Sequence, residues 1–401
     1  MAKNIVICSD GTGNTFDKNI TSVTNLVKRL ELSNHNQQVA VYDQGIGTSA
    51  DRSKAIATYA ERLADSDTLK PLRPPMESSF LPVALFYRAR GLATGFGLKE
   101  NVREMYKELA NLFSDEDRIF LFGFSRGAFT VRALAGLLYR CRLPMEDNIA
   151  DSDSLFEKAW AFFQPMQETE EAKSFREKQR PCDIYFLGIW DTVKSYGGLN
   201  PVILPHLRHN PIVKNVRHAL ALDEHRAWFQ PTTWGLLDSD KDGAMTRLKK
   251  EDRPLYEEQK KNIEEVWFTG CHSDIGGGEK EAGTAQIALR WMLGEAVNIE
   301  YPLMLNEDGI KLLNEADPPP QIHESQNAKW WLIEKVPRAI IDNSGVYPFK
   351  KFAHGNDGQR DLEKLRRDGK IVFHATVKNM RTIASNCNCE FDSRDTKPLP
   401  N

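Results

Sequence analysis

The sequence predicts an α/β protein in which a mostly parallel sheet carries helices on both faces. Short apolar runs rich in β-branched residues alternate along the chain with amphipathic stretches of helical period, the pattern that builds a parallel sheet through crossover helices. The composition agrees, since 41% hydrophobic and 27% charged residues are ordinary for a globular protein. A chain of 401 residues is also long enough to bury a large core without disulfide staples.

Five apolar runs are short enough, and flanked closely enough by turn residues, to be strands rather than buried helices. They are residues 4–9, 38–43, 118–122, 183–190 and 264–269. Apolar residues at helical spacing predict helices at residues 98–113, 126–139, 155–163 and 284–297. A weaker run at residues 370–373 is a further candidate strand.

Two stretches interrupt this alternation. Residues 48–90 are amphipathic and include Pro71, Pro74 and Pro75. They predict a helical lid or cap inserted over the sheet, and a helical excursion without a function is the alternative. Residues 150–180 end in a polar stretch rich in Glu and Lys and predict a second, helical insertion.

Charge and hydropathy exclude several classes of protein. The formal net charge is −3, which argues against a nucleic-acid-binding protein that depends on bulk positive charge. No apolar run approaches the ~20 residues of a membrane span, although contact with a membrane surface stays open. The N-terminal residues lack the apolar core and cleavage site of a secretory signal. The sequence therefore predicts a cytoplasmic protein, with secretion by a route that reads no such signal as the alternative.

The strongest local signal for chemistry is GFSRG at residues 123–127. It lies between a predicted strand and a predicted helix, where G-x-S-x-G places a serine on a sharp turn at the C-terminal edge of a sheet. The two glycines are needed because side chains at these positions would collide with neighbouring backbone. Ser125 is therefore the predicted nucleophile. The alternative is a tight turn between two glycines in which the serine has no catalytic role.

A nucleophilic serine needs a basic histidine and a carboxylate that orients it. In α/β-hydrolases the acid and then the histidine follow the serine along the chain, at the ends of later strands. Asp191 follows the predicted strand at 183–190, and His272 follows the one at 264–269. Both therefore lie at the same edge of a parallel sheet as Ser125, and the three form a predicted catalytic triad. A helix N-cap is the alternative role for Asp191.

The other histidines compete less well for the role of base. His374 follows the candidate strand at 370–373 and is the alternative base. Asp274, close to His272, is a candidate supporting acid, because the glycines that follow it allow close approach of backbone. The earlier histidines stand in polar or basic surroundings and are predicted to lie at the surface or in loops. They are His35, His206, His209, His218 and His225.

The oxyanion of such a reaction needs two backbone N–H donors. The glycine-rich loop after the first strand offers Gly11 and Thr12. The amide of Arg126, at the N-terminus of the helix after the serine, is the other candidate. Asp10 in the same loop is predicted to shape it through an Asx turn.

No metal or other cofactor is predicted. Asp238, Asp240 and Asp242 match the first half of a calcium loop, but Lys249 occupies the position of its bidentate glutamate. A polar surface turn is the preferred prediction, and calcium binding is the weaker alternative. The six cysteines show no disulfide spacing.

Taken together, several segments resemble the type VI secretion lipase effectors and their relatives in one α/β-hydrolase family. They are residues 9–14 (SDGTGN), 45–48 (GIGT), 123–128 (GFSRGA), 188–193 (GIWDTV), 270–278 (GCHSDIGGG) and 290–292 (RWM). The resemblance runs from about residue 4 to residue 380. It implies an α/β-hydrolase fold with Ser125 as nucleophile and, for the secreted members, phospholipase activity on bacterial membrane lipids. A chaperone or an immunity protein is then a candidate partner.

The sequence therefore predicts one catalytic domain over residues 1–385 and a loose tail over residues 386–401. The predicted function is that of a serine carboxylic-ester hydrolase of the lipase or phospholipase type, which acts through an acyl-enzyme on a lipid or another acyl ester. Phe80, Leu81 and Phe86 in the predicted lid are candidates to line an acyl pocket. The alternative is a non-catalytic protein of the same fold that binds an acyl ligand or a partner protein.

Overall fold

A nine-stranded sheet runs through the protein. The computed structural model describes residues 2–11, 20–43, 69–71, 96–193, 204–226, 229–234, 252–279, 282–325, 338–342, 349–353, 360, 362, 371–377 and 389–392. The strand order is β11-β10-β7-β6-β5-β4-β1-β2-β3, and every neighbouring pair is parallel. The predicted α/β fold with a mostly parallel sheet is thereby confirmed.

The bounds of the strands agree closely with the five predicted ones and add others. The strands of the sheet are β1 (Asn4–Ser9), β2 (Gln38–Asp43), β3 (Leu69–Pro71), β4 (Arg118–Phe124), β5 (Ile184–Trp190), β6 (Val213–Ala221), β7 (Ile263–Phe268), β10 (Ile371–His374) and β11 (Cys389–Asp392). A separate antiparallel pair consists of β8 (Arg338–Asp342) and β9 (Phe349–Ala353).

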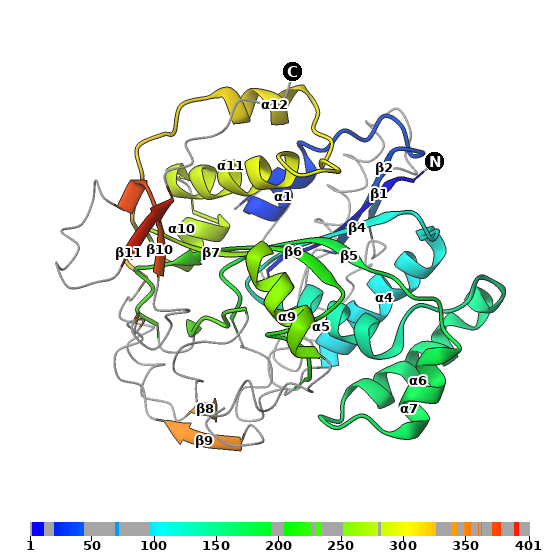
Figure 1. Ribbon diagram of the computed structural model, residues 1–401. Helices are drawn as coiled ribbons and strands as arrows, with labels where there is room; N and C mark the ends of the chain where they lie inside the picture. The colour runs from blue at the N-terminus through cyan, green and yellow to red at the C-terminus, as the bar shows by residue number, and fades with distance from the viewer. Residues whose placement is uncertain are drawn as a thin grey trace, which may run out of the picture.

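Helices cover both faces of the sheet, as Figure 1 shows. One face carries α4 (Phe96–Leu112), α5 (Arg126–Cys141) and α6 (Ser152–Phe163), and the other carries α1 (Ser22–Val27), α11 (Gly283–Val297) and α12 (Glu307–Asn314). In β1, Ile5 and Ile7 join the first of these two cores, while Val6 and Cys8 join the second, as the alternation of side chains along a strand requires. Both faces are therefore buried, which explains the continuous apolar strands.

The structure describes one of the two predicted insertions and only three residues of the other. Residues 150–180 hold α6 and α7 (Glu170–Glu177), so this stretch is largely helical. The predicted lid at residues 48–90 lies outside the described residues except for β3, which pairs with β2 at the edge of the sheet. The predicted tail at residues 386–401 also lies outside them, except for β11.

Strand β6 is absent from the predicted strands because its sequence, VKNVRHALA, is interrupted by polar residues. Those residues are paired within the structure. The Arg217 Nε donates to Glu295 at 2.5 Å, and the His218 Nδ1 lies 2.8 Å from Glu265 Oε1. His218 is completely buried, so its predicted surface position was wrong. Burial lowers the pKa of this imidazole, although Glu265 acts in the opposite direction.

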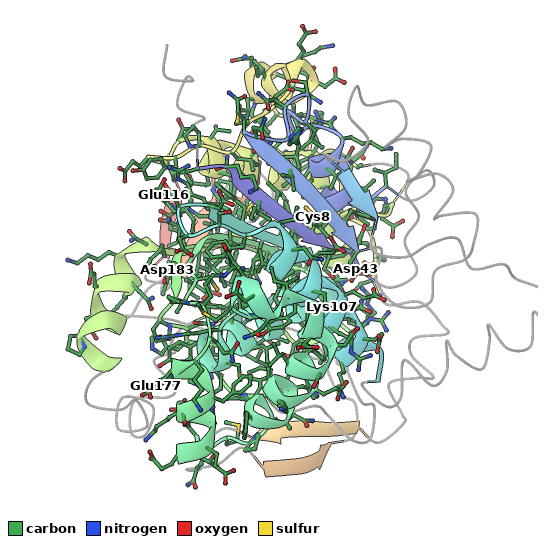
Figure 2. The ribbon with its side chains drawn as sticks, turned by 90° about the vertical axis from the view of Figure 1, so that its right-hand side faces the viewer. Cys8, Asp43, Lys107, Glu116, Glu177 and Asp183 are labelled. Atoms are coloured by element: carbon green, nitrogen blue, oxygen red, sulfur yellow. The ribbon has the colours of Figure 1, made fainter. Side chains whose placement is uncertain are left out.

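The parallel arrangement brings the C-terminal ends of all these strands to one edge. Figure 2 shows Glu116 and Asp183, which precede β4 and β5, on the opposite side of the molecule from Asp43, which ends β2. The direction of winding reverses between β1 and β4, which are neighbours in the sheet. Ligands of open α/β sheets bind at such a reversal, beyond the C-terminal ends of the strands.

Candidate active site

Ser125 occupies the turn between β4 and α5, at the reversal of the sheet. Its backbone lies in the left-handed half of conformational space, with φ 57° and ψ −118°. A residue other than glycine rarely adopts such a conformation, and it costs on the order of 1–3 kcal/mol. The Ser125 amide donates to the Trp190 carbonyl at 3.0 Å, which ties the strained turn to the end of β5.

The glycines on either side of Ser125 allow this turn to pack against backbone. A Cβ at position 123 would lie 2.7 Å from backbone atoms of Ala128, and one at position 127 would lie 2.0 Å from the carbonyl oxygen of Ser9. No real side chain tolerates the second approach. The turn is therefore pressed against the end of β1, as G-x-S-x-G requires of its flanking glycines.

Ser125, His272 and Asp191 form one chain of hydrogen bonds. Ser125 Oγ lies 2.8 Å from His272 Nε2, and His272 Nδ1 lies 2.6 Å from Asp191 Oδ2. Asp191 follows β5, and His272 opens the short helix α10 (His272–Gly276) after β7. All three residues are at least nine-tenths buried. The structure thus brings together the three residues predicted as a triad from positions up to 147 residues apart.

The electrostatics of Asp191 fix the direction of these hydrogen bonds. Burial would raise the pKa of this carboxyl, but the Arg360 guanidinium and the bond to His272 outweigh it and hold the pKa well below its usual range. An ionised carboxylate only accepts hydrogen bonds, so His272 Nδ1 donates to Asp191. In the neutral form of the imidazole, Nε2 then carries the lone pair that can accept the hydroxyl proton of Ser125.

Arg360 is the partner of Asp191 that sequence analysis did not identify. Its Nη1 donates to Asp191 Oδ1 at 2.5 Å, and its Nη2 donates to Asp191 Oδ2 at 2.8 Å. The Ala221 amide also donates to Oδ1, at 3.0 Å. An isolated arginine in a region without a motif carries no sequence signal that distinguishes it from a surface arginine.

The imidazole of His272 lies between two aromatic rings. The ring centroids of Phe124 and Phe229 lie 4.6 and 4.9 Å from that of His272. On its backbone side, the His272 amide donates to Glu224 Oε2 at 3.2 Å. Burial would raise the pKa of Glu224, but its hydrogen bonds from Arg226 and the charge of that arginine lower it overall. The position of His272 is thus fixed by the packing of its ring and by the hydrogen bond of its backbone amide.

Asp10, directly after β1, is buried and accepts several hydrogen bonds. The carboxylate of Asp10 accepts hydrogen bonds from Thr21 Oγ1 at 2.6 Å, Tyr42 Oη at 2.8 Å and Thr24 Oγ1 at 3.1 Å. It also accepts one from the Gly11 amide at 2.6 Å. Burial nevertheless raises the pKa of Asp10. Asp10 thereby connects the end of β1 to α1 and β2, and the predicted Asx turn, which involves residues outside the described ones, stays a prediction.

The structure describes two of the three candidate oxyanion donors, Gly11 and Arg126. Because the Gly11 N–H donates to Asp10, it offers no donor to a substrate in this conformation. Thr12 lies outside the described residues. Arg126 is the first residue of α5, directly after Ser125, so its amide lies at a helix N-terminus, where anions are favoured.

His374, the alternative base, does not join the hydrogen-bonded chain. It lies at the end of β10, with its Nδ1 2.9 Å from Thr376 Oγ1 and its ring stacked on Phe268. Asp274 does not contact the imidazole of His272 either. It accepts hydrogen bonds from the Cys271 and His323 amides at 2.8 and 3.0 Å, and thereby supports the turn that holds His272.

Several predicted features cannot be placed. Phe80, Leu81 and Phe86, proposed to line an acyl pocket, lie outside the described residues, and so do Asp238, Asp240 and Asp242. Within the described part of the chain, no cluster of three or more histidine, cysteine or acidic side chains could hold a metal ion. None of the helices described there is both long and apolar enough to cross a membrane.

The chain matches one protein family over most of its length. Residues 3–295 match the family described as the type VI secretion system (T6SS) phospholipase effector Tle1-like catalytic domain. An uncharacterized protein of Saccharomyces cerevisiae is 30% identical over 239 residues, which make up 57% of this chain and 32% of the yeast protein.

Two solved structures are also similar. A crystal structure of an uncharacterized protein from Pseudomonas aeruginosa is 20% identical, with a TM-score of 0.37 over 74% of this chain and 45% of that one. The structure of the Tle1 effector bound to the VgrG spike of the type 6 secretion system is 17% identical, with a TM-score of 0.28 over 69% of this chain and 51% of that one. The chain thus spans about half, or less, of the length of the proteins it matches.

Proposed function

The chain belongs to the family of T6SS phospholipase effector Tle1-like catalytic domains, and we propose that it is a serine carboxylic-ester hydrolase of the lipase or phospholipase type. The observation that carries the proposal is the hydrogen-bonded chain from Ser125 through His272 to Asp191. A serine on a strained turn, an imidazole within hydrogen-bond distance of its hydroxyl, and an ionised carboxylate are the parts that acyl transfer to a serine requires.

In the first half of the reaction, Ser125 Oγ attacks the carbonyl carbon of the ester while His272 Nε2 takes the hydroxyl proton. Asp191 stabilises the imidazolium that forms. The carbonyl oxygen becomes an oxyanion, for which the Arg126 amide is the proposed donor at the start of α5. The tetrahedral intermediate then collapses, the C–O bond to the alcohol breaks, and His272 returns the proton to the leaving alcohol.

In the second half, water replaces the alcohol. His272 Nε2 takes a proton from water as the water oxygen attacks the acyl-enzyme, and the imidazolium then protonates Ser125 Oγ as it leaves. The products are the free acid and the unmodified serine. A second oxyanion donor must come from the loop after β1, so this scheme requires either that the Gly11 amide leave Asp10 or that Thr12 supply its own amide.

A lipid ester is the proposed substrate class. The family description names phospholipase effectors, and the described surroundings of His272 are aromatic, with Phe124 and Phe229 against its ring. The acyl-pocket role of Phe80, Leu81 and Phe86 remains a prediction from sequence.

The test is the hydrolysis of p-nitrophenyl esters with acyl chains of 2 to 16 carbons, followed by release of fatty acid from phosphatidylcholine and phosphatidylethanolamine vesicles. We expect hydrolysis by the wild-type protein, a rate that increases with chain length, and no hydrolysis above background by Ser125→Ala. Phe80→Ala and Phe86→Ala should lower the rate for long chains more than that for short ones. Equal losses at all chain lengths would contradict the predicted acyl pocket.

The same assays distinguish the alternative function. A folded wild-type protein that binds fatty acid or phospholipid but turns over none of these esters would contradict the proposal and favour the non-catalytic acyl-binding protein. Hydrolysis of short esters alone, with no release of fatty acid from vesicles, would support an esterase and contradict the lipid substrate.

A further inference from the structure

We infer that Arg360 is a positioning residue of this site, which holds Asp191 and Phe229 in place. Part of the site then comes from the chain beyond residue 295, where the family match ends. Arg360 lies 65 residues past residue 295. The inference rests on the proposed function, because it concerns the residues proposed to carry it.

The contacts of Arg360 are concentrated on the site. Its two terminal nitrogens bind the two oxygens of Asp191 in the parallel, forked geometry that distinguishes arginine from lysine. The Nη1 atom also donates to the Ala221 carbonyl, next to the Ala221 amide that binds Asp191. The Nη2 atom donates to the Phe229 carbonyl at 2.9 Å. One guanidinium thereby connects the carboxylate, the end of β6 and the residue whose ring packs against His272.

Burial makes this pairing more than a surface ion pair. The side chains of Arg360 and Asp191 are both completely buried. Removing one partner of a buried pair leaves an uncompensated charge, which is far more costly than losing an exposed pair. With Arg360 present, the guanidinium and the carboxylate neutralise each other, and Asp191 remains ionised without a counter-charge from His272.

The carboxylate is needed in one orientation only. Asp191 Oδ2 accepts from both His272 Nδ1 and Arg360 Nη2, whereas Oδ1 accepts from Arg360 Nη1 and the Ala221 amide. Without Arg360, Oδ1 keeps only the Ala221 amide, and the carboxylate can rotate about its Cβ–Cγ bond. Asp191 Oδ2, the oxygen that fixes the tautomer of His272, is then no longer held in place.

Removing Arg360 should also change the pH dependence of the reaction. The charged and titratable groups that face Asp191 are Arg360, His272 and, from β6, His218, with Glu224 behind His272. Burial raises the pKa of Asp191, and Arg360 provides the largest opposing effect. In Arg360→Met, Asp191 should therefore protonate at higher pH, and activity should be lost at a higher pH on acidification.

The experiment measures kcat, KM and the pH profile of p-nitrophenyl butyrate hydrolysis for Arg360→Met, Arg360→Lys and Arg360→Ala. We expect Arg360→Met to lower kcat by about 10-fold to 100-fold, as is typical of residues that orient a functional side chain, with KM within about twofold. Arg360→Lys should also fall short of the wild type, because an ammonium cannot bind both oxygens in the same fork. Guanidinium ion at millimolar concentration should partly restore Arg360→Ala.

The matched control is Arg180→Met. Arg180 is also buried, but its guanidinium donates to the Phe113 and Ala110 carbonyls, which precede β4. This variant should lower the free energy of unfolding without changing kcat or the pH profile, and guanidinium should not affect Arg180→Ala. A shared loss of kcat in the Arg360 and Arg180 variants would mean that the effect is one of stability, and would overturn the inference.

A second readout does not depend on turnover. The proton shared by His272 Nδ1 and Asp191 should give a low-field proton resonance in the wild type, which His272→Gln assigns by removing it. We expect this resonance to shift or broaden in Arg360→Lys, the variant most certain to fold. A folded Arg360→Lys with the wild-type resonance, kcat and pH profile would overturn the inference, whereas a wild type that hydrolyses no ester would instead contradict the proposed function.

Discussion

Asp191 receives four hydrogen bonds, two from Arg360 and one each from His272 and the Ala221 amide. Asp191 stands directly after β5, with a positive φ of 38°. The hydrogen bonds and the neighbouring guanidinium hold its pKa well below its usual range. Asp191 is therefore ionised at neutral pH.

Replacing this charge with a neutral amide tests its role. In Asp191→Asn, the amide can place a donor against His272 Nδ1, which favours the wrong tautomer of the base. We expect kcat for ester hydrolysis to fall by about 10,000-fold, the loss seen when the acid of a serine triad becomes an amide. KM should change little. A reduction of less than about tenfold in a folded variant would show that Asp191 does not orient the base.

Cys271 provides a second test at the scale of single residues. It directly precedes His272, is buried, and has its pKa raised to about 11, mainly by burial and secondarily by the charge of Asp274. At pH 7.5 fewer than about one thiol in a thousand is then a thiolate, the reactive form. We expect the folded protein to resist alkylation of Cys271 by iodoacetamide, as measured by peptide mass spectrometry. Rapid alkylation under native conditions would contradict its buried placement.

At the scale of elements, the turn from β4 to α5 depends on the absence of a side chain at Gly127. In Gly127→Ala, the new methyl group would meet the Ser9 carbonyl at 2.0 Å, so α5 or β1 must shift. We expect the free energy of unfolding to fall by at least about 1–3 kcal/mol, as overpacking usually costs, together with a large loss of activity. Urea denaturation and ester hydrolysis measure the two effects.

The matched control for this substitution is Gly294→Ala in α11. A Cβ there lies 4.0 Å from its nearest neighbour, Leu313 Cδ2, so there is room for a methyl group. Alanine is also the better helix former, and the variant should gain about 0.5–1 kcal/mol of stability. If Gly127→Ala were as stable as Gly294→Ala, the close approach of the serine turn to β1 would be wrong.

A strand could be predicted when its own residues form a continuous apolar run. Strand β4 is apolar and continuous, and its predicted and observed bounds agree within two residues. Strand β6 is also largely buried, but its Arg217 and His218 are paired with Glu295 and Glu265 from other elements. No local pattern contains that information, because the pairing exists only after β6 has been placed beside β7.

The same reasoning applies to the site. Ser125, Asp191 and His272 could be predicted because each follows a recognisable strand in a parallel sheet, and such strands end at one edge. Arg360 and Glu224 could not, because neither follows a predicted strand and no motif surrounds them. The expectation for Gly11 missed that a neighbouring carboxylate competes for its amide.

At the scale of the whole molecule, two histidines predict how stability depends on pH: His209, which is partly buried, and His218, which is completely buried. Burial lowers the pKa of His209 from 6.5 to about 4, and it also lowers that of His218. The unfolded chain then binds protons below pH 6.5 that the folded protein does not, so acidification favours unfolding. The contribution of these histidines to the free energy of unfolding should be fully present above about pH 6.5 and should be lost progressively between about pH 6.5 and pH 4.

Urea denaturation at pH 7.5 and at pH 5 measures this decline. We expect a lower free energy of unfolding at pH 5, and a smaller difference between the two values in His209→Gln, which cannot take up the proton. The exposed His35→Gln serves as the control and should keep the wild-type difference. Equal stability at both values of pH would show that neither His209 nor His218 resists protonation.

The most direct test of the central proposal is covalent labelling of the serine. A fluorophosphonate reacts with a serine hydroxyl only when a base activates it, and leaves an adduct whose position can be read by mass spectrometry. We expect wild-type protein to be labelled on Ser125, with no labelling of Ser125→Ala and strongly slowed labelling of His272→Gln. An unlabelled, folded wild type, or an adduct on another serine, would contradict Ser125 as the nucleophile.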